Sequence, residues 1–134
     1  MRRVFADTSA FIAAYDPRDQ EHGVAGRLLK ELIGTGARLL TTNFILDETL
    51  TWFRRDADAR ESVGRAILEC VLVDCVRLEE ADERRAWSLC LKLRDRDFSF
   101  TDLTSFAVME RLKVREVFTF DEDFRRYGRF EVIT

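Results

Sequence analysis

Short apolar runs alternate with helical patterns along the whole chain, and this alternation limits the fold more than any other feature. Runs of apolar and β-branched residues predict strands at 4–6, 38–42, 75–78, 114–120 and 130–133. Apolar spacings of three and four residues predict helices at 10–15, 21–33, 44–55, 59–73, 80–94, 102–112 and 121–127. Strands that alternate with helices form a parallel sheet covered on both faces. The pattern therefore predicts an α/β fold.

The length of 134 residues is that of one ordinary domain, and an apolar share of 46% is enough for a globular core. No apolar run approaches the roughly 20 residues of a membrane span, and the basic start at Arg2 and Arg3 is not followed by the apolar stretch of a signal peptide. Three cysteines form no paired motif, which is typical of reduced thiols. We therefore expect one domain over 1–134, located in the cytoplasm and not in a membrane.

A net charge of −3 argues at first against a nucleic-acid partner. If four of the 25 acidic residues hold cations, 21 remain against 22 basic residues, so the rest of the surface is close to neutral. Arginine supplies nearly all of the positive charge, and its guanidinium suits two-pronged contacts with phosphate. A genome that favours arginine codons would give the same composition.

Two aspartates follow predicted strands directly. Asp7 comes after the strand at 4–6, and Asp121 comes after the strand at 114–120. The functional crevice of an open parallel sheet lies beyond the carboxyl ends of its strands. Either aspartate alone could be a helix cap or a turn former, but two of them at such ends favour a shared acidic site.

Two further carboxylates are candidates for this site. Asp102 opens a predicted helix, where the helix dipole alone would also favour an acidic residue. Glu48 shares a helical face with Ile45 and Trp52, so we expect it to point inward, whereas Asp47 lies on the polar outward face. A buried carboxylate must be protonated, paired with a group such as arginine, or bound to a cation.

Carboxylate oxygens suit Mg²⁺ or Mn²⁺, which can lower the pKa of a bound water and neutralise charge on phosphate. The sequence excludes several other chemistries. His22 is the only histidine, which excludes a histidine acid–base pair and a histidine-rich zinc site. It lies in a charged stretch at the start of a predicted helix, where we expect it to be solvated, and this argues against a Ser-His-Asp triad. Neither a P-loop nor the glycine fingerprint of dinucleotide-binding folds is present.

Four short segments carry a resemblance to a known family. The runs 4–9 (VFADTS), 46–49 (LDET), 100–107 (FTDLTSFA) and 117–124 (VFTFDEDF) resemble the motifs of PIN domains, especially the VapC-type toxins of toxin–antitoxin modules. The match keeps the family's order and approximate spacing over the whole chain. The resemblance implies one PIN domain over 1–134, a three-layer α/β/α sandwich with a five-stranded parallel sheet, and Mg²⁺ or Mn²⁺ as cofactor. It also implies hydrolysis of RNA that leaves a 5′-phosphate, a homodimer, and neutralisation by a cognate antitoxin protein.

Carried over by position, the resemblance gives a catalytic and metal-binding set of Asp7, Glu48, Asp102 and Asp121. Ser9 and Thr119 match hydroxyl positions that support these acids. Asp123 is the alternative to Asp121 as the fourth acid, and we prefer Asp121 because it adjoins the strand end.

Arginines near the acidic residues are candidates for contacts with RNA phosphates, although each could equally be a solvated surface residue. They follow the Glu48 helix or follow Asp121. The candidates are Arg54, Arg55, Arg125, Arg126 and Arg129. We expect the aromatic residues Trp52, Phe53 and Trp87 to be core or dimer contacts rather than platforms for stacked bases.

Three other functions remain open. One is a PIN nuclease that processes housekeeping RNA or acts on DNA, and another is a PIN relative that binds RNA or protein without catalysis. A phosphoacceptor signalling domain would also place acids at strand ends, but its late lysine is missing here, where Thr119 and Asp121 stand. The main prediction from sequence is an endoribonuclease toxin.

Overall fold

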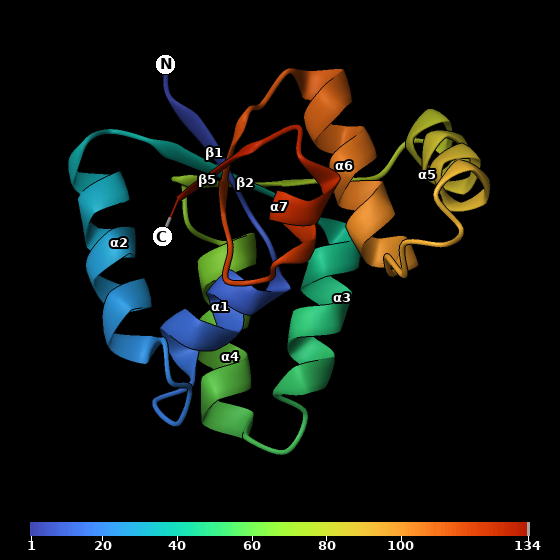
Figure 1. Cartoon of the computed structure of the whole chain (residues 1–134). Helices are drawn as coiled ribbons and strands as arrows, with labels where there is room; N and C mark the ends of the chain where they lie inside the picture. Colours follow the sequence, from blue (N-terminus) through green and yellow to red (C-terminus); the bar gives the residue numbers. More distant parts are fainter. Residues whose placement is uncertain (134) are drawn as a thin grey trace.

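The computed structural model describes residues 1–133 and is built on a five-stranded sheet (Figure 1). The strands are β1 (Arg3–Ala6), β2 (Arg38–Thr42), β3 (Val73–Val76), β4 (Glu116–Phe118) and β5 (Glu131–Ile133). Their order is β3-β2-β1-β4-β5, and every pairing is parallel. The predicted α/β fold with a five-stranded parallel sheet is confirmed. Thr134, the last residue of the expected 1–134 domain, lies outside the described residues.

Seven helices connect the strands within the described part of the chain. They are α1 (Thr8–Tyr15), α2 (His22–Gly34), α3 (Asn43–Trp52), α4 (Ala57–Leu68), α5 (Glu80–Lys92), α6 (Phe100–Leu112) and α7 (Asp123–Tyr127). Their order agrees with the predicted order, but α4 ends before the predicted limit because a turn precedes β3. Across residues 1–133, the structure contains no helix with the length and apolarity needed to cross a bilayer.

The chain connectivity creates a crevice beside β1. The α1–α2 and α3–α4 connections step from β1 to β2 and on to β3, whereas the α5–α6 connection returns across the sheet to β4. Because crossovers between parallel strands are right-handed, the returning pair covers the opposite face, and Figure 1 shows α5 outside α6 there. After β1 the chain continues to β2 on one side, and after β4 it continues to β5 on the other side. The strand order therefore reverses between β1 and β4, and this place is the topological switch point of the sheet.

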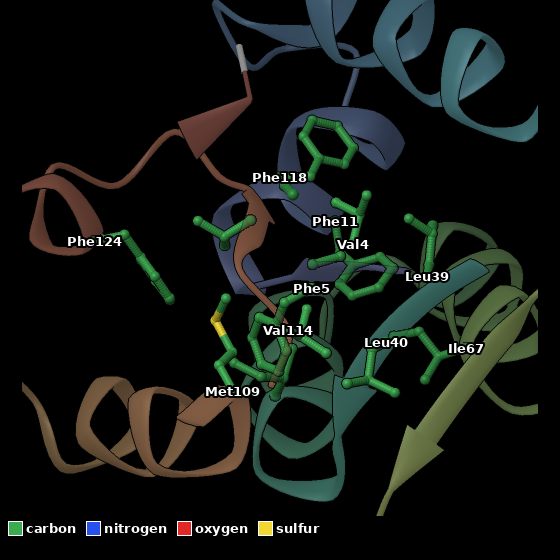
Figure 2. Packing of buried hydrophobic residues seen from close by; sticks show 14 of the residues in the cluster. Val4, Phe5, Phe11, Leu39, Leu40, Ile67, Met109, Val114, Phe118 and Phe124 are labelled. Atoms are coloured by element: carbon green, nitrogen blue, oxygen red, sulfur yellow. The ribbon is translucent and has the colours of Figure 1, made fainter. Parts of the chain in front are cut away.

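The hydrophobic core lies on both faces of the central strand. Val4 and Phe5 of β1 are fully buried, and Figure 2 shows their side chains among those of Leu39, Leu40 and Phe118. A central strand covered on both faces has no polar side, which explains the continuous apolar run before Asp7. The three cysteines are free thiols, each half-buried.

A cluster of aromatic rings joins α6 to the C-terminal part of the chain. Phe106 of α6 stacks on Tyr127 at 4.2 Å between ring centroids and meets the ring of Phe124 edge-on at 5.1 Å. Phe98 meets Phe106 edge-on at 5.4 Å. Ring pairs of these geometries add specific stabilisation to the burial of their area. The short helix α7 is therefore anchored through Phe124 and Tyr127, both of which are buried.

One charged pair joins α5 to α6 below the surface. Asp82 is only 2% exposed and caps the first turn of α5 by accepting the N–H of Glu79 at 2.9 Å. The guanidinium of Arg111 donates to both of its oxygens, at 2.7 and 2.9 Å. Burial raises the pKa of the Asp82 carboxyl, but the hydrogen bonds from Arg111 and Glu79 outweigh this effect and hold it below its usual range.

We predict that Asp82→Asn lowers the free energy of unfolding by about 2 kcal/mol at neutral pH, because hydrogen bonds to a charged group are lost. The folded pKa of Asp82 is depressed, so its contribution is complete above the ordinary carboxyl pKa of about 4 and is lost as the pH falls through the folded pKa. Urea unfolding at several pH values measures this difference. Glu83→Gln, at an exposed site of the same helix, is the control. A difference that persisted unchanged well below pH 4 would contradict the prediction.

Candidate active site

Asp7 lies at the switch point and is the most deeply buried acid of the site, with an exposure of 4%. It caps α1, and its Oδ1 accepts the N–H of Ala10 at 3.1 Å and the hydroxyl of Ser9 at 2.8 Å. Its Oδ2 accepts the hydroxyl of Thr119 at 2.8 Å. Burial raises the pKa of Asp7 to about 7 despite these hydrogen bonds, and the charge of Asp121 adds to the increase.

Ser9 and Thr119 connect the ends of the two strands that flank the switch point. The hydroxyl of Ser9 accepts the N–H of Phe120 at 2.9 Å, and the hydroxyl of Thr119 accepts the N–H of Asp121 at 3.0 Å. Both hydroxyls also donate to Asp7. The same two side chains therefore orient the Asp7 carboxylate and the backbone that carries Asp121.

A second group of acids stands at the same edge of the sheet. Asp102, Asp121 and Asp123 each offer a carboxylate oxygen, and these oxygens lie within 4.8 Å of one another. Asp102 is in the first turn of α6, Asp123 is in the first turn of α7, and Asp121 precedes α7. Asp123 thus lies beside Asp121 in the group, so the two acids are joint candidates and not alternatives.

The surroundings disfavour the ionisation of Asp102 and of Asp121. Burial is the main cause that raises the pKa of Asp102, followed by a hydrogen bond to Asp123 and by the charges of Asp121 and Asp123. The pKa of Asp121 is also raised, again mainly by burial. Carboxylates placed together in this way must hold protons or share a cation.

Glu48 does not point into the core, so that part of the sequence interpretation is wrong. The buried face of α3 consists of Ile45 and Thr49, and Phe53 continues it just after the helix, whereas Glu48 and Trp52 are exposed. The apolar pattern does not decide between two faces of this helix, because either Thr49 or Trp52 can continue a buried stripe that starts at Ile45. The Oε1 of Glu48 accepts a hydrogen bond from the hydroxyl of Thr8. Glu48 therefore lies at the rim of the site, next to the residue that follows Asp7.

Asp47 is exposed, as predicted, but it shares a hollow with Glu48. The volume of this hollow is about 510 Å³, and its lining also includes Asn43, Phe44, Thr51 and Thr101. Glu48 is fixed by a hydrogen bond from Thr8, whereas no hydrogen bond to the Asp47 side chain is present within residues 1–133. The two adjacent acids therefore differ in how they are held, not in burial.

Arg54 and Arg126 are exposed, and both contact neighbouring backbone or acidic groups. Arg126 forms an ion pair with Asp123 at 2.7 Å, and its guanidinium lies 5.1 Å from the ring centre of Phe98. Arg54 donates to the carbonyl of Thr51 at 3.0 Å. The role of Arg126 in placing Asp123 was missed by the sequence interpretation, although the spacing of three residues on a helix is a recognisable signal.

The other three candidate arginines are also exposed. Arg125 lines a hollow of about 310 Å³ together with Thr119 and Asp121. Arg129 lies over the ring of Tyr127 at 5.9 Å, and Arg55 lies just beyond α3. Among the candidate arginines that follow Asp121, Arg125 is therefore the one that shares a hollow with Asp121.

The donor set fits a divalent cation. Several carboxylate oxygens converge, and burial raises the pKa of Asp7, Asp102 and Asp121, so a bound cation would favour the ionised form of each. An all-oxygen set of this kind is what Mg²⁺ and Mn²⁺ prefer, in contrast to the nitrogen and sulfur ligands typical of zinc. The residues present can therefore hold such a cation.

Comparisons with known proteins give consistent results. The PIN domain family model matches residues 4–130. The chain is 35% identical over 130 residues to a protein of Mycobacterium tuberculosis named 23S rRNA-specific endonuclease VapC20, which covers 96% of this chain and 97% of that one. It is 28% identical over 111 residues to a VapC ribonuclease of Archaeoglobus fulgidus, with coverage of 81% and 71%.

Two solved structures share the fold. The crystal structure of the Mycobacterium tuberculosis VapC20, described as a Sarcin-Ricin loop cleaving toxin, superposes with a TM-score of 0.84 at 30% identity, over 96% of this chain and 98% of that one. VapBC2 from Rickettsia felis, solved with a promoter DNA fragment, gives a TM-score of 0.74 at 11% identity, over 98% and 97%. The second likeness supports the fold alone.

We predict that Mg²⁺ or Mn²⁺ raises the melting temperature, and more so at about pH 8.5 than at about pH 6. The folded pKa of Asp7 is raised to about 7, so this residue's contribution to metal-free stability is complete below its unfolded pKa and is lost as the pH rises through the folded value. A cation offsets that loss. Differential scanning fluorimetry with EDTA or millimolar metal measures the effect.

Asp102→Asn is the matched variant for this measurement. It should raise the melting temperature of the metal-free protein at the higher pH, because one member of a crowded acidic group is neutralised. It should also remove most of the gain from metal. A gain of equal size at both pH values, or one unaffected by Asp102→Asn, would contradict the assigned acids.

Proposed function

The chain belongs to the PIN domain family, and from this premise we propose that it is a metal-dependent endoribonuclease, the toxin of a toxin–antitoxin module. The observation that carries the proposal is the group of Asp102, Asp121 and Asp123 near Asp7 at the switch point, with burial raising the pKa of Asp7, Asp102 and Asp121. The names of the VapC relatives, which cover nearly the whole chain, support RNA as the substrate.

Asp7, Asp102, Asp121 and Asp123 are the residues that would hold Mg²⁺ or Mn²⁺. When bound, such a cation supplies a Lewis acid that makes a water more acidic and neutralises charge on phosphate. Ser9 and Thr119 orient the Asp7 carboxylate, and Arg126 orients the Asp123 carboxylate through the ion pair at 2.7 Å. Asp7 and Asp123 are thus held by neighbours before the substrate arrives, which is the preorganisation that catalysis requires.

Glu48 has a separate role in this proposal. Its Oε1 is occupied by the hydroxyl of Thr8, and no hydrogen bond to its Oε2 is present within the described chain. Because the side chain is exposed at the rim, Oε2 can accept a proton from the attacking water. Glu48 is therefore assigned as the group that positions and deprotonates water.

The partners follow from the same proposal. We assign a cognate antitoxin as the protein partner, the cytoplasm as the location and a homodimer as the working form. Leu68 at the end of α4 and Val71 just after it are both exposed. Exposed apolar side chains that lie close together in this way support an interface with another protein chain.

We predict that Asp7→Asn lowers the rate of RNA cleavage by about a thousandfold or more while the fold is retained. Asparagine is as good a helix cap as aspartate, so α1 keeps its start. A gel assay with a mixed unstructured RNA and Mn²⁺, with EDTA as a blank, gives the rate. Circular dichroism verifies folding.

Asp74→Asn is the control, because this strand aspartate is paired with Arg38 at 2.6 Å rather than with other acids. Its cleavage rate should stay close to that of the wild type. If the wild-type protein bound RNA but did not cleave it with any divalent metal, the nuclease proposal would be replaced by a binding function. If it cleaved single-stranded DNA but not RNA, the substrate class would be wrong.

We predict that Glu48→Gln and Asp47→Asn differ although both remove one negative charge from adjacent exposed positions. Glu48→Gln removes the proton acceptor fixed by Thr8 and should lower the cleavage rate by about a hundredfold or more. Asp47→Asn should keep the rate within a few-fold and stability within about 0.5 kcal/mol. The two rates are compared at saturating Mn²⁺. An inactive Asp47→Asn beside an active Glu48→Gln would reverse the assignment.

A further inference from the structure

Trp52 is exposed on the side of α3 that carries Glu48. Its exposure is 58%, so of the two expected places, core or dimer contact, the core is excluded for Trp52, whereas Phe53 is buried in the core. Residues four apart on a helix lie on one face, about 6 Å apart along the axis. Trp52 therefore presents an aromatic surface one turn away from the rim of the acidic site.

The region around Trp52 is held by a buried carboxylate. Asp16, just after α1, is 7% exposed and accepts the N–H of Arg18 at 2.9 Å and its guanidinium at 3.2 Å. These two bonds from Arg18 are the main reason that the pKa of Asp16 lies below its usual range, and the indole of Trp52 adds a smaller contribution. The indole and the Arg18 guanidinium are thus gathered at one carboxylate. Figure 1 shows α3, which carries Trp52, beside α1, which ends just before Asp16 and Arg18.

A hollow of about 350 Å³ lies beside this pair. Its lining includes Trp52, Arg18 and Arg55, so an aromatic surface and two guanidinium groups border one space. Asp56 and Asp58 also line it at the start of α4, where the Oδ1 of Asp56 accepts the N–H of Ala59. The Arg18 side chain is 84% exposed although it pairs with Asp16, and Arg55 is exposed too, so both guanidinium groups can be reached by a ligand from solvent.

An indole beside guanidinium groups matches the chemistry of a nucleotide. Bases of single-stranded RNA stack on aromatic side chains whatever their sequence, and arginine binds the phosphates. We propose that Trp52 is the stacking platform for a base of the RNA substrate about one or two nucleotides from the scissile bond, and that Arg18 and Arg55 contact its phosphates. This subsite rests on the proposed ribonuclease function. It further implies that the bound RNA extends from the acidic site along α3.

Trp87 provides an internal control. It is the only other tryptophan of the chain, and its exposure of 57% matches that of Trp52. It stands on α5, whose main packing partner is α6. A general preference of RNA for exposed aromatic residues would affect both tryptophans, whereas the proposed subsite affects only Trp52.

Binding is measured in the Asp7→Asn background with Mg²⁺, using fluorescein-labelled decauridylate. Trp52→Ala should weaken binding about tenfold, since a stacked base contributes about 1–3 kcal/mol. Trp52→Phe should restore most of the affinity, because it keeps an aromatic face. Trp87→Ala should stay within about twofold of the parent. Both tryptophans are exposed, so neither alanine variant should unfold the chain, and circular dichroism verifies this.

Fluorescence identifies the stacked residue directly. Trp87→Phe leaves Trp52 as the only indole, and its emission should be quenched when decauridylate is added. Trp52→Phe leaves only Trp87, whose emission should not change. A decauridylate with one abasic position should bind the parent more weakly than intact decauridylate does. Trp52→Ala should bind both RNAs with the same affinity, because the stacking contact that the abasic position removes is already missing in this variant.

Each other result overturns the proposal. Unchanged affinity in Trp52→Ala, or quenching of Trp87 alone, places the RNA elsewhere on the molecule. If Trp52→Ala instead converts a dimer to a monomer by sedimentation while RNA affinity is kept, Trp52 belongs to an interface between two copies of this chain. These failures leave the ribonuclease function intact as long as the wild-type protein cleaves RNA, whereas loss of cleavage by the wild type would refute the function itself.

Discussion

The carboxylate of Asp7 is the interaction on which the site depends. It begins α1 by accepting the N–H of Ala10, and it joins the end of β1 to the end of β4 through the hydroxyl of Thr119. The same group faces the charge of Asp121. Because Asp7 links the ends of β1 and β4, it cannot move unless both strand ends move. The position of its carboxylate is therefore as rigid as the sheet.

The other acids are arranged outward from this buried group. Asp102 and Asp123 come from the first turns of α6 and α7, where the helix dipole favours a negative charge and offsets part of the repulsion within the cluster. Glu48 stands at the exposed rim, and Trp52 lies one turn beyond it on α3. The carboxylates of the site thus range from buried and fixed, at Asp7, to exposed, at Glu48. The proposed path for RNA runs from the buried end to the exposed end.

Much of this could be read from the sequence, and the reasons for the failures are physical. The apolar run before Asp7 and the late strand before Asp121 indicate buried parallel strands, and the order of strands and helices is confirmed. The predicted inward direction of Glu48 was wrong because a single helix of ten residues offers two similar apolar stripes. Only packing against the neighbouring helices decides whether Trp52 or Phe53 is buried. The nearness of Asp123 to Asp102 depends on how α7 packs on α6, which no local pattern records.

The shortness of α7 has a consequence for how the activity of such a protein can vary. Five residues cannot form a stable helix on their own, so Asp123 stands where the rings of Phe124 and Tyr127 place it beneath α6. The spacing of the carboxylates is then a property of the aromatic packing behind them. Substitutions among these rings can therefore change the spacing of the acids, and with it the proposed cation binding, without altering any acid. Natural variation and laboratory engineering could tune the site in this way through the interior of the protein.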